Sequence, residues 1–236
     1  MQMTPRGRAG WIAHVWKAAT QQHHKELRAL FAPFVPADAV VIDVGAHAGQ
    51  FAKLFARLAP RGAVYAFEPS EYARSVMVPA VAVSGLKNIT LIPMGLSDAP
   101  GEMVLHTPIK RRGGVGFGLA HLGTDDGARD VVDQTVRLTT LDAFAAARDL
   151  TRLDFIKADI EGWELQALRG GAATLARFKP ALYLEVDDEC LARANATPAD
   201  LWALLEPMGY KARTTPGLLP VTAYQGAGDY LFVAKD

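Results

Sequence analysis

The chain has 236 residues, of which 50% are hydrophobic and 21% are charged, and its 25 Lys and Arg balance its 25 Asp and Glu. This composition is typical of one soluble domain that buries its own core without disulfides or a structural metal. A net charge of zero disfavours a protein whose main partner is a nucleic-acid backbone, because such domains usually carry clustered basic residues. The lone Cys190 excludes a disulfide framework.

The N-terminal segment begins with basic residues, as a signal peptide does. His14 and Lys17 interrupt its only apolar stretch, so no secretion signal is predicted. Nowhere do eighteen or more apolar residues follow one another, which excludes a membrane-spanning helix. We therefore expect a cytoplasmic protein.

The first part of the chain differs from the rest. Residues 1–10 contain Pro5, Gly7 and two arginines, a composition typical of a loose arm. Apolar residues at helical spacing then predict one or two helices, so we interpret residues 1–37 as an N-terminal arm with helices and residues 38–236 as the main domain.

From residue 38 onward, short apolar runs alternate with amphipathic segments, the pattern of a βαβ fold. The runs are nearly all apolar, as parallel strands covered on both faces should be. The predicted strands are VVIDV at 40–44, AVYAFE at 63–68, ITLIPM at 89–94, DFIKAD at 154–159 and ALYLEV at 181–186.

Amphipathic segments between these strands predict crossover helices. Apolar residues recur at helical spacing over 51–58, 165–175 and 201–208. The chain closes with two runs, YKART and YLFVAK, that suit an antiparallel hairpin at the end of the sheet. The expected fold is a doubly wound α/β sheet that is mostly parallel.

One segment breaks this alternation. Residues 99–139 hold seven glycines and a run of three basic residues at 110–112. An insertion of this length is usually functional or mobile, so we interpret it as a possible substrate lid. His106 and His121 lie within it and are weak candidates for proton transfer.

The most specific local motif is VVIDVGAHAGQF, a buried strand followed by a glycine-bearing turn and a helix. Gly45 and Gly49 allow a tight turn and a close approach to a ligand, while Asp43 ends the strand. The spacing is GxxxG rather than GxGxxG, which favours a ligand without a pyrophosphate. A plain turn between strand and helix remains the alternative interpretation.

Two further acidic positions follow strands. Glu68 ends the second predicted strand, and a carboxylate there matches the two hydroxyls of a ribose. Lys157, Asp159 and Glu161 lie at the end of the fourth strand, in FIKADIEGWELQALRGG. Ligands bind at this edge of open α/β sheets, but ion pairing at a helix start explains the same residues equally well.

These motifs together resemble the FkbM family of S-adenosylmethionine-dependent methyltransferases. The similarity extends from VIDVGAHAGQF and YAFEP through NITLIPMGLSDAPG and VRLTTLDAF to DFIKADIEGWELQALRGG and KPALYLEV, covering roughly residues 40–187. Two departures are Gly95, where the family's block has alanine, and Pro79, which interrupts the segment after FEP.

The resemblance implies a class I methyltransferase fold, a Rossmann-like sheet of seven strands with an antiparallel C-terminal hairpin. It also implies S-adenosylmethionine as the cofactor. Glu185 adds a carboxylate at the same sheet edge, but no second strong ligand motif accompanies it, so we expect no metal. The implied cofactor-binding residues are Asp43, Gly45, Ala46, His47, Gly49, Glu68 and Pro69, with Met94, Gly95, Leu96 and Ser97 beside the adenine and Asp159 near the sulfonium.

The resemblance further implies methyl transfer to a hydroxyl of a sugar or natural product. Asp159 and Glu161 are the candidate general bases, and Lys157 is an orienter or, if burial neutralises it, a base itself. The partner is then a small-molecule or glycan acceptor, with no nucleic acid. Rival hypotheses are an NAD-dependent oxidoreductase and a cofactor-binding protein without turnover.

Overall fold

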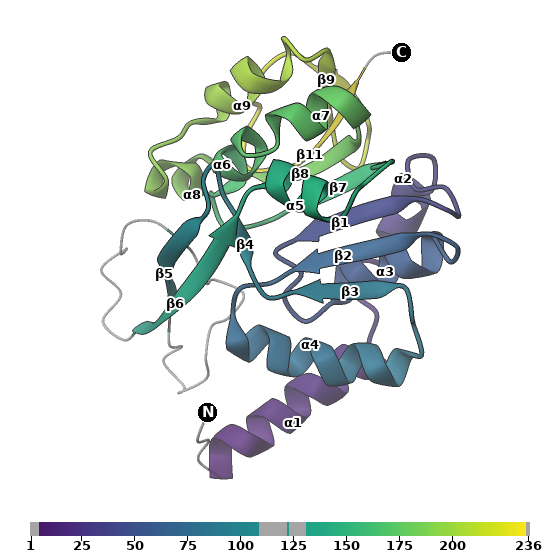
Figure 1. Cartoon of the computed structure of the whole chain (residues 1–236), viewed down its shortest axis with the longest axis vertical. Helices are drawn as coiled ribbons and strands as arrows, with labels where there is room; N and C mark the ends of the chain where they lie inside the picture. Colours follow the sequence, from purple (N-terminus) through teal and green to yellow (C-terminus); the bar gives the residue numbers. More distant parts are fainter. Residues whose placement is uncertain (1–4, 109–121, 123–130, 235–236) are drawn as a thin grey trace.

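The computed structural model describes residues 5–108, 122 and 131–234, and its main feature is a mixed sheet of eight strands (Figure 1). The strand order is β10-β9-β11-β8-β7-β1-β2-β3. Five neighbouring strands are parallel: β1 (Val40–Val44), β2 (Ala63–Phe67), β3 (Ile89–Ile92), β7 (Phe155–Ala158) and β8 (Ala181–Val186). Three antiparallel strands extend the β8 edge: β9 (Tyr210–Thr214), β10 (Pro220–Val221) and β11 (Gly228–Ala234).

Both faces of the parallel strands are covered, which explains why their sequences are almost wholly apolar. In β1, Ile42 packs into one core cluster, and Val41 packs into the other, with Phe31 and Phe55. The second cluster draws on α2 (Arg28–Phe31), α3 (Gln50–Leu58) and, through Met77, α4 (Glu71–Ser84). The first cluster draws on α5 (Leu141–Ala147), α6 (Glu164–Arg169), α7 (Ala172–Phe178), α8 (Asp188–Arg193) and α9 (Pro198–Leu205).

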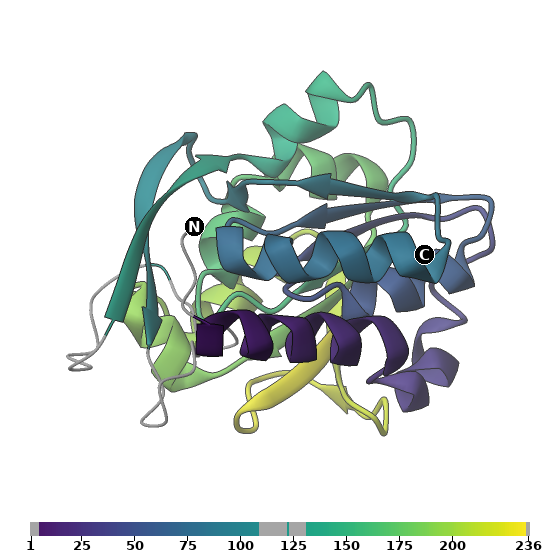
Figure 2. The ribbon, with the colours of Figure 1, turned by 90° about the horizontal axis from the view of Figure 1, so that it is seen from below.

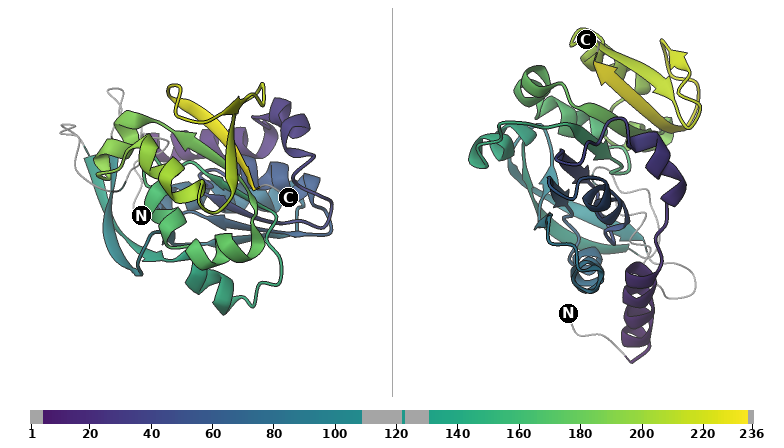
Figure 3. Two further views of the ribbon diagram at one scale, coloured as in Figure 1. Left: turned by 90° about the horizontal axis from the view of Figure 1, so that it is seen from above. Right: turned by 90° about the vertical axis from the view of Figure 1, so that its right-hand side faces the viewer.

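The N-terminal helix α1 (Pro5–Thr20) packs on α4 (Glu71–Ser84), as Figure 2 shows. Trp11 Nε1 donates to the Ser75 hydroxyl at 3.0 Å, and His14 Nδ1 lies 2.8 Å from the Tyr72 hydroxyl. A short 3-10 helix, η1 (Lys25–Leu27), then leads to α2. The helix α1 and the strands β9 and β11 lie at opposite ends of the molecule (Figure 3).

The predicted fold is confirmed: β3, β2, β1, β7 and β8 run parallel, and β11 and β9 pair antiparallel at the C-terminal end. The short strand β10 adds an eighth strand to the seven expected. Among the described residues, no helix combines the length and apolar character that a membrane crossing requires.

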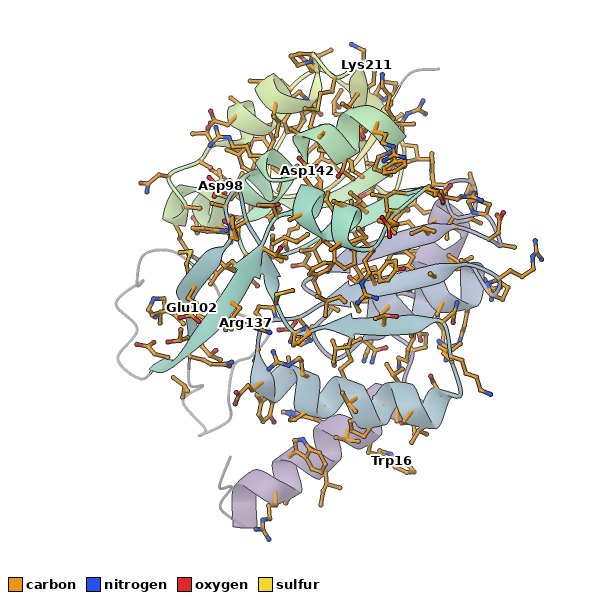
Figure 4. The ribbon with its side chains drawn as sticks, viewed as in Figure 1. Trp16, Asp98, Glu102, Arg137, Asp142 and Lys211 are labelled. Carbon is orange, nitrogen blue, oxygen red and sulfur yellow. The ribbon has the colours of Figure 1, made fainter. Side chains whose placement is uncertain are left out.

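The described part of the insertion at 99–139 contributes two strands to a second sheet of three strands, and its interpretation as a substrate lid stays a prediction. Strand β6 (Val131–Thr139) pairs with β4 (Gly95–Leu96) and, antiparallel, with β5 (Gly101–Pro108). Leu105 on β5 and Val136 and Leu138 on β6 are buried, as the inward-facing residues of half-buried strands are. The many glycines of the segment obscured this strand pattern in the sequence. Figure 4 labels Glu102 and Arg137, which face each other across this ribbon. The basic run 110–112 and residue 121 lie outside the described residues.

Three local expectations are wrong. The helix α1 begins at Pro5, because proline is well suited to the first helical position, so the loose arm does not reach residue 10. Pro79 lies inside α4 without ending it. The helix predicted over 165–175 is divided into α6 and α7 at Gly170 and Gly171.

Candidate active site

A pocket of about 240 Å³ lies at the carboxyl ends of β1, β2 and β7, where ligands of open α/β sheets bind. Its lining comes from the turn after β1, the residues after β2 and β7, the ribbon β4 to β6 and the segment before η1. The lining residues are His24, Val44 to Ala48, Gln50, Phe51, Phe67 to Pro69, Gly95, Leu96, Leu105, Leu122, Lys157, Asp159 to Glu161 and Trp163.

The turn after β1 approaches the end of β7 closely. Gly45 has φ 74°, and a Cβ there would lie 2.0 Å from the Asp159 carbonyl oxygen. The N–H groups of Gly45 and Ala46 both donate to the Phe67 carbonyl at 3.0 Å. Position 45 therefore requires glycine, and the turn is fixed by backbone bonds to β2.

Glu68 is held at the end of β2 by two backbone N–H groups. His47 N donates to Oε2 at 2.7 Å, and Ser70 N donates to Oε1 at 2.8 Å. Each carboxylate oxygen keeps one lone pair for a ligand in the pocket. Burial raises the pKa of Glu68 to about 7, although both N–H groups oppose the rise.

Lys157 is buried between two carboxylates. Its Nζ lies 3.6 Å from Asp43 Oδ1 and 3.5 Å from Asp159 Oδ2, and it donates to the Val44 and Gly45 carbonyls at 3.3 and 3.1 Å. Burial lowers the pKa of Lys157, but Asp159 and Asp43 outweigh it, so the pKa is raised. The raised pKa favours the cationic form, which suits an orienting charge better than a base.

The Asp159 carboxylate shares a hydrogen bond with Glu185 on β8. Burial favours a higher pKa for Asp159, but Lys157 and Glu185 outweigh it and the pKa is lowered. Burial, and then Asp159, raise the pKa of Glu185 to about 9. At neutral pH the pair is thus an Asp159 carboxylate beside a protonated Glu185.

The turn from β7 to α6 directs Glu161 to the pocket. Glu161 has φ 56° and Gly162 has φ 102°, and a Cβ on Gly162 would lie 2.0 Å from the Cys190 carbonyl oxygen. Burial, and then Asp159, raise the pKa of Glu161, whose Oε2 lies 3.9 Å from Arg193 Nη1. Glu164 stays outside the pocket and accepts from Ile160 N at 2.8 Å.

The opposite side of the pocket is apolar. Leu105 on β5, Leu122 and Leu138 form a small cluster against which Trp163 packs. Trp163 Nε1 donates to the Ser97 hydroxyl at 3.2 Å, and that hydroxyl donates to Asp98, labelled in Figure 4. The apolar lining formed by Leu96, Leu105 and Leu122 is called the apolar slot, and it suits a flat, largely apolar group.

The structure brings together ten of the fourteen predicted site residues in this pocket: Gly45, Ala46, His47, Glu68, Pro69, Gly95, Leu96, Lys157, Asp159 and Glu161. Four do not line it. Asp43 lies beneath Lys157, Gly49 caps α3, Met94 packs against the core, and Ser97 holds Trp163.

Ten of the lining residues were not among the predicted site residues, and they include His24, Phe51, Leu105 and Leu122. Phe51 carried only its helical spacing as a signal, and the two leucines belong to the glycine-rich insertion at 99–139, for which no strand was predicted. Among the described residues, no group of three His, Cys, Asp or Glu side chains is arranged to hold a metal ion.

Comparison with known proteins places this geometry in a family. The model of the methyltransferase FkbM domain matches residues 43–212. The chain is 26% identical over 164 residues to the 2-O-methyltransferase NoeI of Sinorhizobium fredii, covering 64% of this chain and 65% of NoeI. It is 30% identical over 185 residues to the AMB antimetabolite synthetase AmbE of Pseudomonas aeruginosa, covering 66% of this chain and 9% of AmbE. The chain therefore spans less than two thirds of either relative.

A solved structure supports the fold. The methyltransferase FkbM from Methylobacillus flagellatus superposes with a TM-score of 0.53 at 15% identity, covering 94% of this chain and 58% of that one. The predicted class I methyltransferase fold is confirmed. With the family model matching well over half of its length, the chain belongs to the FkbM methyltransferase family, whose cofactor is S-adenosylmethionine.

Proposed function

We propose that the chain transfers a methyl group to a hydroxyl oxygen of a sugar or natural product. The observation that carries this proposal is the contrast between the two ends of the pocket. Glu68 follows β2, and Asp159 and Glu161 follow β7, so these lining residues lie on opposite sides of β1. The first end suits a nucleoside, and the second suits a group that must lose a proton.

The residues at the first end fit the cofactor. The free lone pairs of Glu68 would accept from the two ribose hydroxyls, and the slot of Leu96, Leu105 and Leu122 would hold the adenine. Gly45 lets the turn after β1 pack against the Asp159 carbonyl, which fixes the backbone of this turn at the pocket wall beside the cofactor.

The cofactor supplies an activated methyl group and a sulfur that leaves with the electron pair of the broken carbon–sulfur bond. The protein must then align an acceptor oxygen and take its proton as the new carbon–oxygen bond forms. We assign this proton to the Glu161 carboxylate, because a base with a raised pKa serves better near neutral pH. The methyl ether and S-adenosylhomocysteine are the products.

Asp159 and Lys157 have a positioning role in this proposal. The pKa of Asp159 is lowered, so it holds its proton too weakly to be the better base, and it supplies a fixed negative charge instead. Lys157 binds Asp159 and the carbonyls of Val44 and Gly45, which ties the turn after β1 to β7. Both residues thus keep the pocket in shape for alignment.

Two facts support a hydroxylated small-molecule or glycan acceptor. NoeI is named a 2-O-methyltransferase, which supports transfer to oxygen. The net charge of zero disfavours a nucleic-acid acceptor, since phosphate contacts require clustered cations. Because the chain belongs to a methyltransferase family, we do not propose the nicotinamide-dependent oxidoreductase.

The first test is calorimetric titration with S-adenosylhomocysteine, with NAD as the control ligand. We expect micromolar binding of S-adenosylhomocysteine alone, and its loss in Glu68→Ala. Equal affinity in the wild type and Glu68→Ala would reject the ribose role of Glu68.

The second test measures S-adenosylhomocysteine release with a panel of methyl glycosides and phenols. Turnover of a member to its methyl ether supports the proposal. Cofactor binding without turnover of any member would favour the rival hypothesis of a cofactor-binding protein without turnover.

A further inference from the structure

One wall of the pocket includes a residue that precedes the family match. This residue, His24, lines the pocket together with Gln50 and Phe51, the first residues of α3. The matched region begins at residue 43, so the features that define the family do not account for His24. His24 belongs to the segment between α1 and η1.

Several contacts hold that segment against α3. Lys53 donates to the Ala18 carbonyl near the end of α1, and Gln22 Nε2 donates to the Gln50 carbonyl at 2.9 Å. The His24 ring stacks on the Phe51 ring with centroids 4.4 Å apart and planes at 15°. The ring is therefore anchored at the pocket wall rather than carried by a free loop.

The backbone of His24 is left-handed, with φ 61° and ψ 24°. A residue other than glycine rarely adopts this conformation, and such residues cluster at functional sites. His47 and Glu161, which also line the pocket, have φ 54° and 56°. The three strained positions thus surround one cavity.

The Phe51 ring, on which His24 stacks, has its centroid 5.1 Å from Lys157 Nζ. Lys157 lies 3.5 Å from Asp159, so His24 lies on the Asp159 side of the pocket. Lys157 and Asp229 act on its ring from β7 and β11, and Glu26 and His23 act from its own segment. Burial lowers the pKa of His24, so the ring is neutral at pH 7. In the part of the chain that the structure describes, neither ring nitrogen has a hydrogen-bond partner. A neutral imidazole offers one donor and one acceptor.

We propose that His24 recognises the acceptor, through a hydrogen bond from its ring to a second hydroxyl beside the one that faces Glu161. This inference rests on the proposed function, because it needs a hydroxylated acceptor at that end of the pocket. It requires an acceptor with at least two neighbouring hydroxyls. His24 is then a specificity residue supplied from outside the matched domain.

The test uses the full chain with ¹⁵N-labelled histidine, saturated with S-adenosylhomocysteine. The probes are the methyl glycosides of glucose, galactose and mannose, which carry neighbouring hydroxyls, with cyclohexanol as the single-hydroxyl control. The His24 ring signals are assigned by their loss in His24→Phe. We expect at least one glycoside to shift these signals, and cyclohexanol to leave them unchanged.

Matched variants separate recognition from packing. His24→Phe keeps a ring to stack on Phe51 but cannot form the hydrogen bond, and we expect at least a tenfold loss of glycoside affinity. His24→Asn suits the left-handed backbone and keeps a donor and an acceptor, so it should restore part of that affinity. The exposed neighbour variant, His23→Phe, should bind as the wild type does.

Each contrary outcome has a distinct meaning. No shift of the His24 signals by any glycoside, with S-adenosylhomocysteine bound normally, overturns the role of His24 and leaves the methyltransferase function standing. A loss of S-adenosylhomocysteine affinity in His24→Phe also overturns it, because His24 then serves the cofactor. Failure of the wild type to bind S-adenosylhomocysteine rejects the proposed function itself, and this inference with it.

Discussion

The two ends of the pocket are built in different ways. The Glu68 end is fixed by the backbone: the turn at Gly45 donates to Phe67, and Glu68 accepts from two N–H groups. The other end is made of side chains, His24 and Glu161, that stand on left-handed backbone in segments far apart in the chain.

This difference indicates which residues of the site can be substituted without disturbing the fold. Backbone contacts at the Glu68 end depend on the pairing of β1 with β2 and β7, so a change there disturbs the sheet edge itself. The side chains at the other end change without altering a strand. The Glu68 end is therefore suited to a ligand held in one fixed geometry, and the other end is suited to selecting the acceptor.

The variant with the largest expected effect disrupts the Glu68 end of the pocket. Gly45→Ala places a Cβ 2.0 Å from the Asp159 carbonyl oxygen, which forces the turn away from β7. We expect no detectable binding of S-adenosylhomocysteine by calorimetry. Binding equal to that of the wild type would contradict the close approach on which this end depends.

Gly85→Ala is the matched control for this variant. Gly85 has φ 69°, close to the 74° of Gly45, but nothing lies within 4 Å of its added Cβ. The substitution therefore isolates the backbone strain, at a cost of about 1 to 3 kcal/mol in the free energy of unfolding. It should lower stability in urea denaturation and leave ligand affinity unchanged.

The second prediction breaks the side-chain end. Glu161→Gln keeps the shape of the side chain but removes its basicity, so we expect turnover to fall by about 10² to 10⁴. Affinity for S-adenosylhomocysteine should stay within about twofold, because the first end is intact. Glu189→Gln, an exposed position on α8, is the control. Full turnover in Glu161→Gln would remove this residue from the proton transfer.

The third prediction tests the Glu68 end of the pocket by a change of pH. The pKa of Glu68 is raised to about 7, so its carboxylate gains a proton as the pH falls from 8 to 6. The protonated group loses acceptor capacity for the ribose, and we expect S-adenosylhomocysteine affinity to fall about tenfold over this range. Calorimetry at both pH values should show no such change in Glu68→Gln. A flat profile in the wild type would show that Glu68 stays ionised.

Much of the Glu68 end could be predicted from the sequence, because its determinants are local. A strand, a glycine turn and a helix follow one another in VVIDVGAHAGQF, and Glu68 ends the next strand. In a parallel sheet the ends of neighbouring strands meet at one edge, so order along the chain gives proximity in space. The parallel strands themselves were evident from their apolar runs.

The rest depends on packing between distant segments. His24 reaches the pocket only because Lys53 and Gln50 hold the end of α1 against α3. Leu105 lines it only because β5 pairs with β6, in a glycine-rich insertion for which no strand was predicted. Neither relation has a short sequence pattern, so both remained hidden.

The smallest expected effect concerns Glu164, which supports the turn that carries Glu161. Its buried carboxyl accepts from Ile160 N, and burial raises its pKa to about 7. The folded state thus binds a proton more tightly than the unfolded state, whose pKa is near 4.5. Wild-type stability should therefore fall as the pH rises from about 4.5 to 7 and stay lower above pH 7.

Glu164→Gln keeps an oxygen that accepts from Ile160 N and removes the ionisation. We expect it to raise the free energy of unfolding by about 1 kcal/mol at pH 8, with little change at pH 5, in urea denaturation. Glu189→Gln, at an exposed position, should show no such difference between the two pH values. An equal loss of stability at both pH values would mean that the second carboxylate oxygen, rather than the charge, matters to the turn. In that case the position of Glu161 would also depend on the hydrogen bond from Ile160 N to Glu164, and the two ends of the pocket would be built more alike.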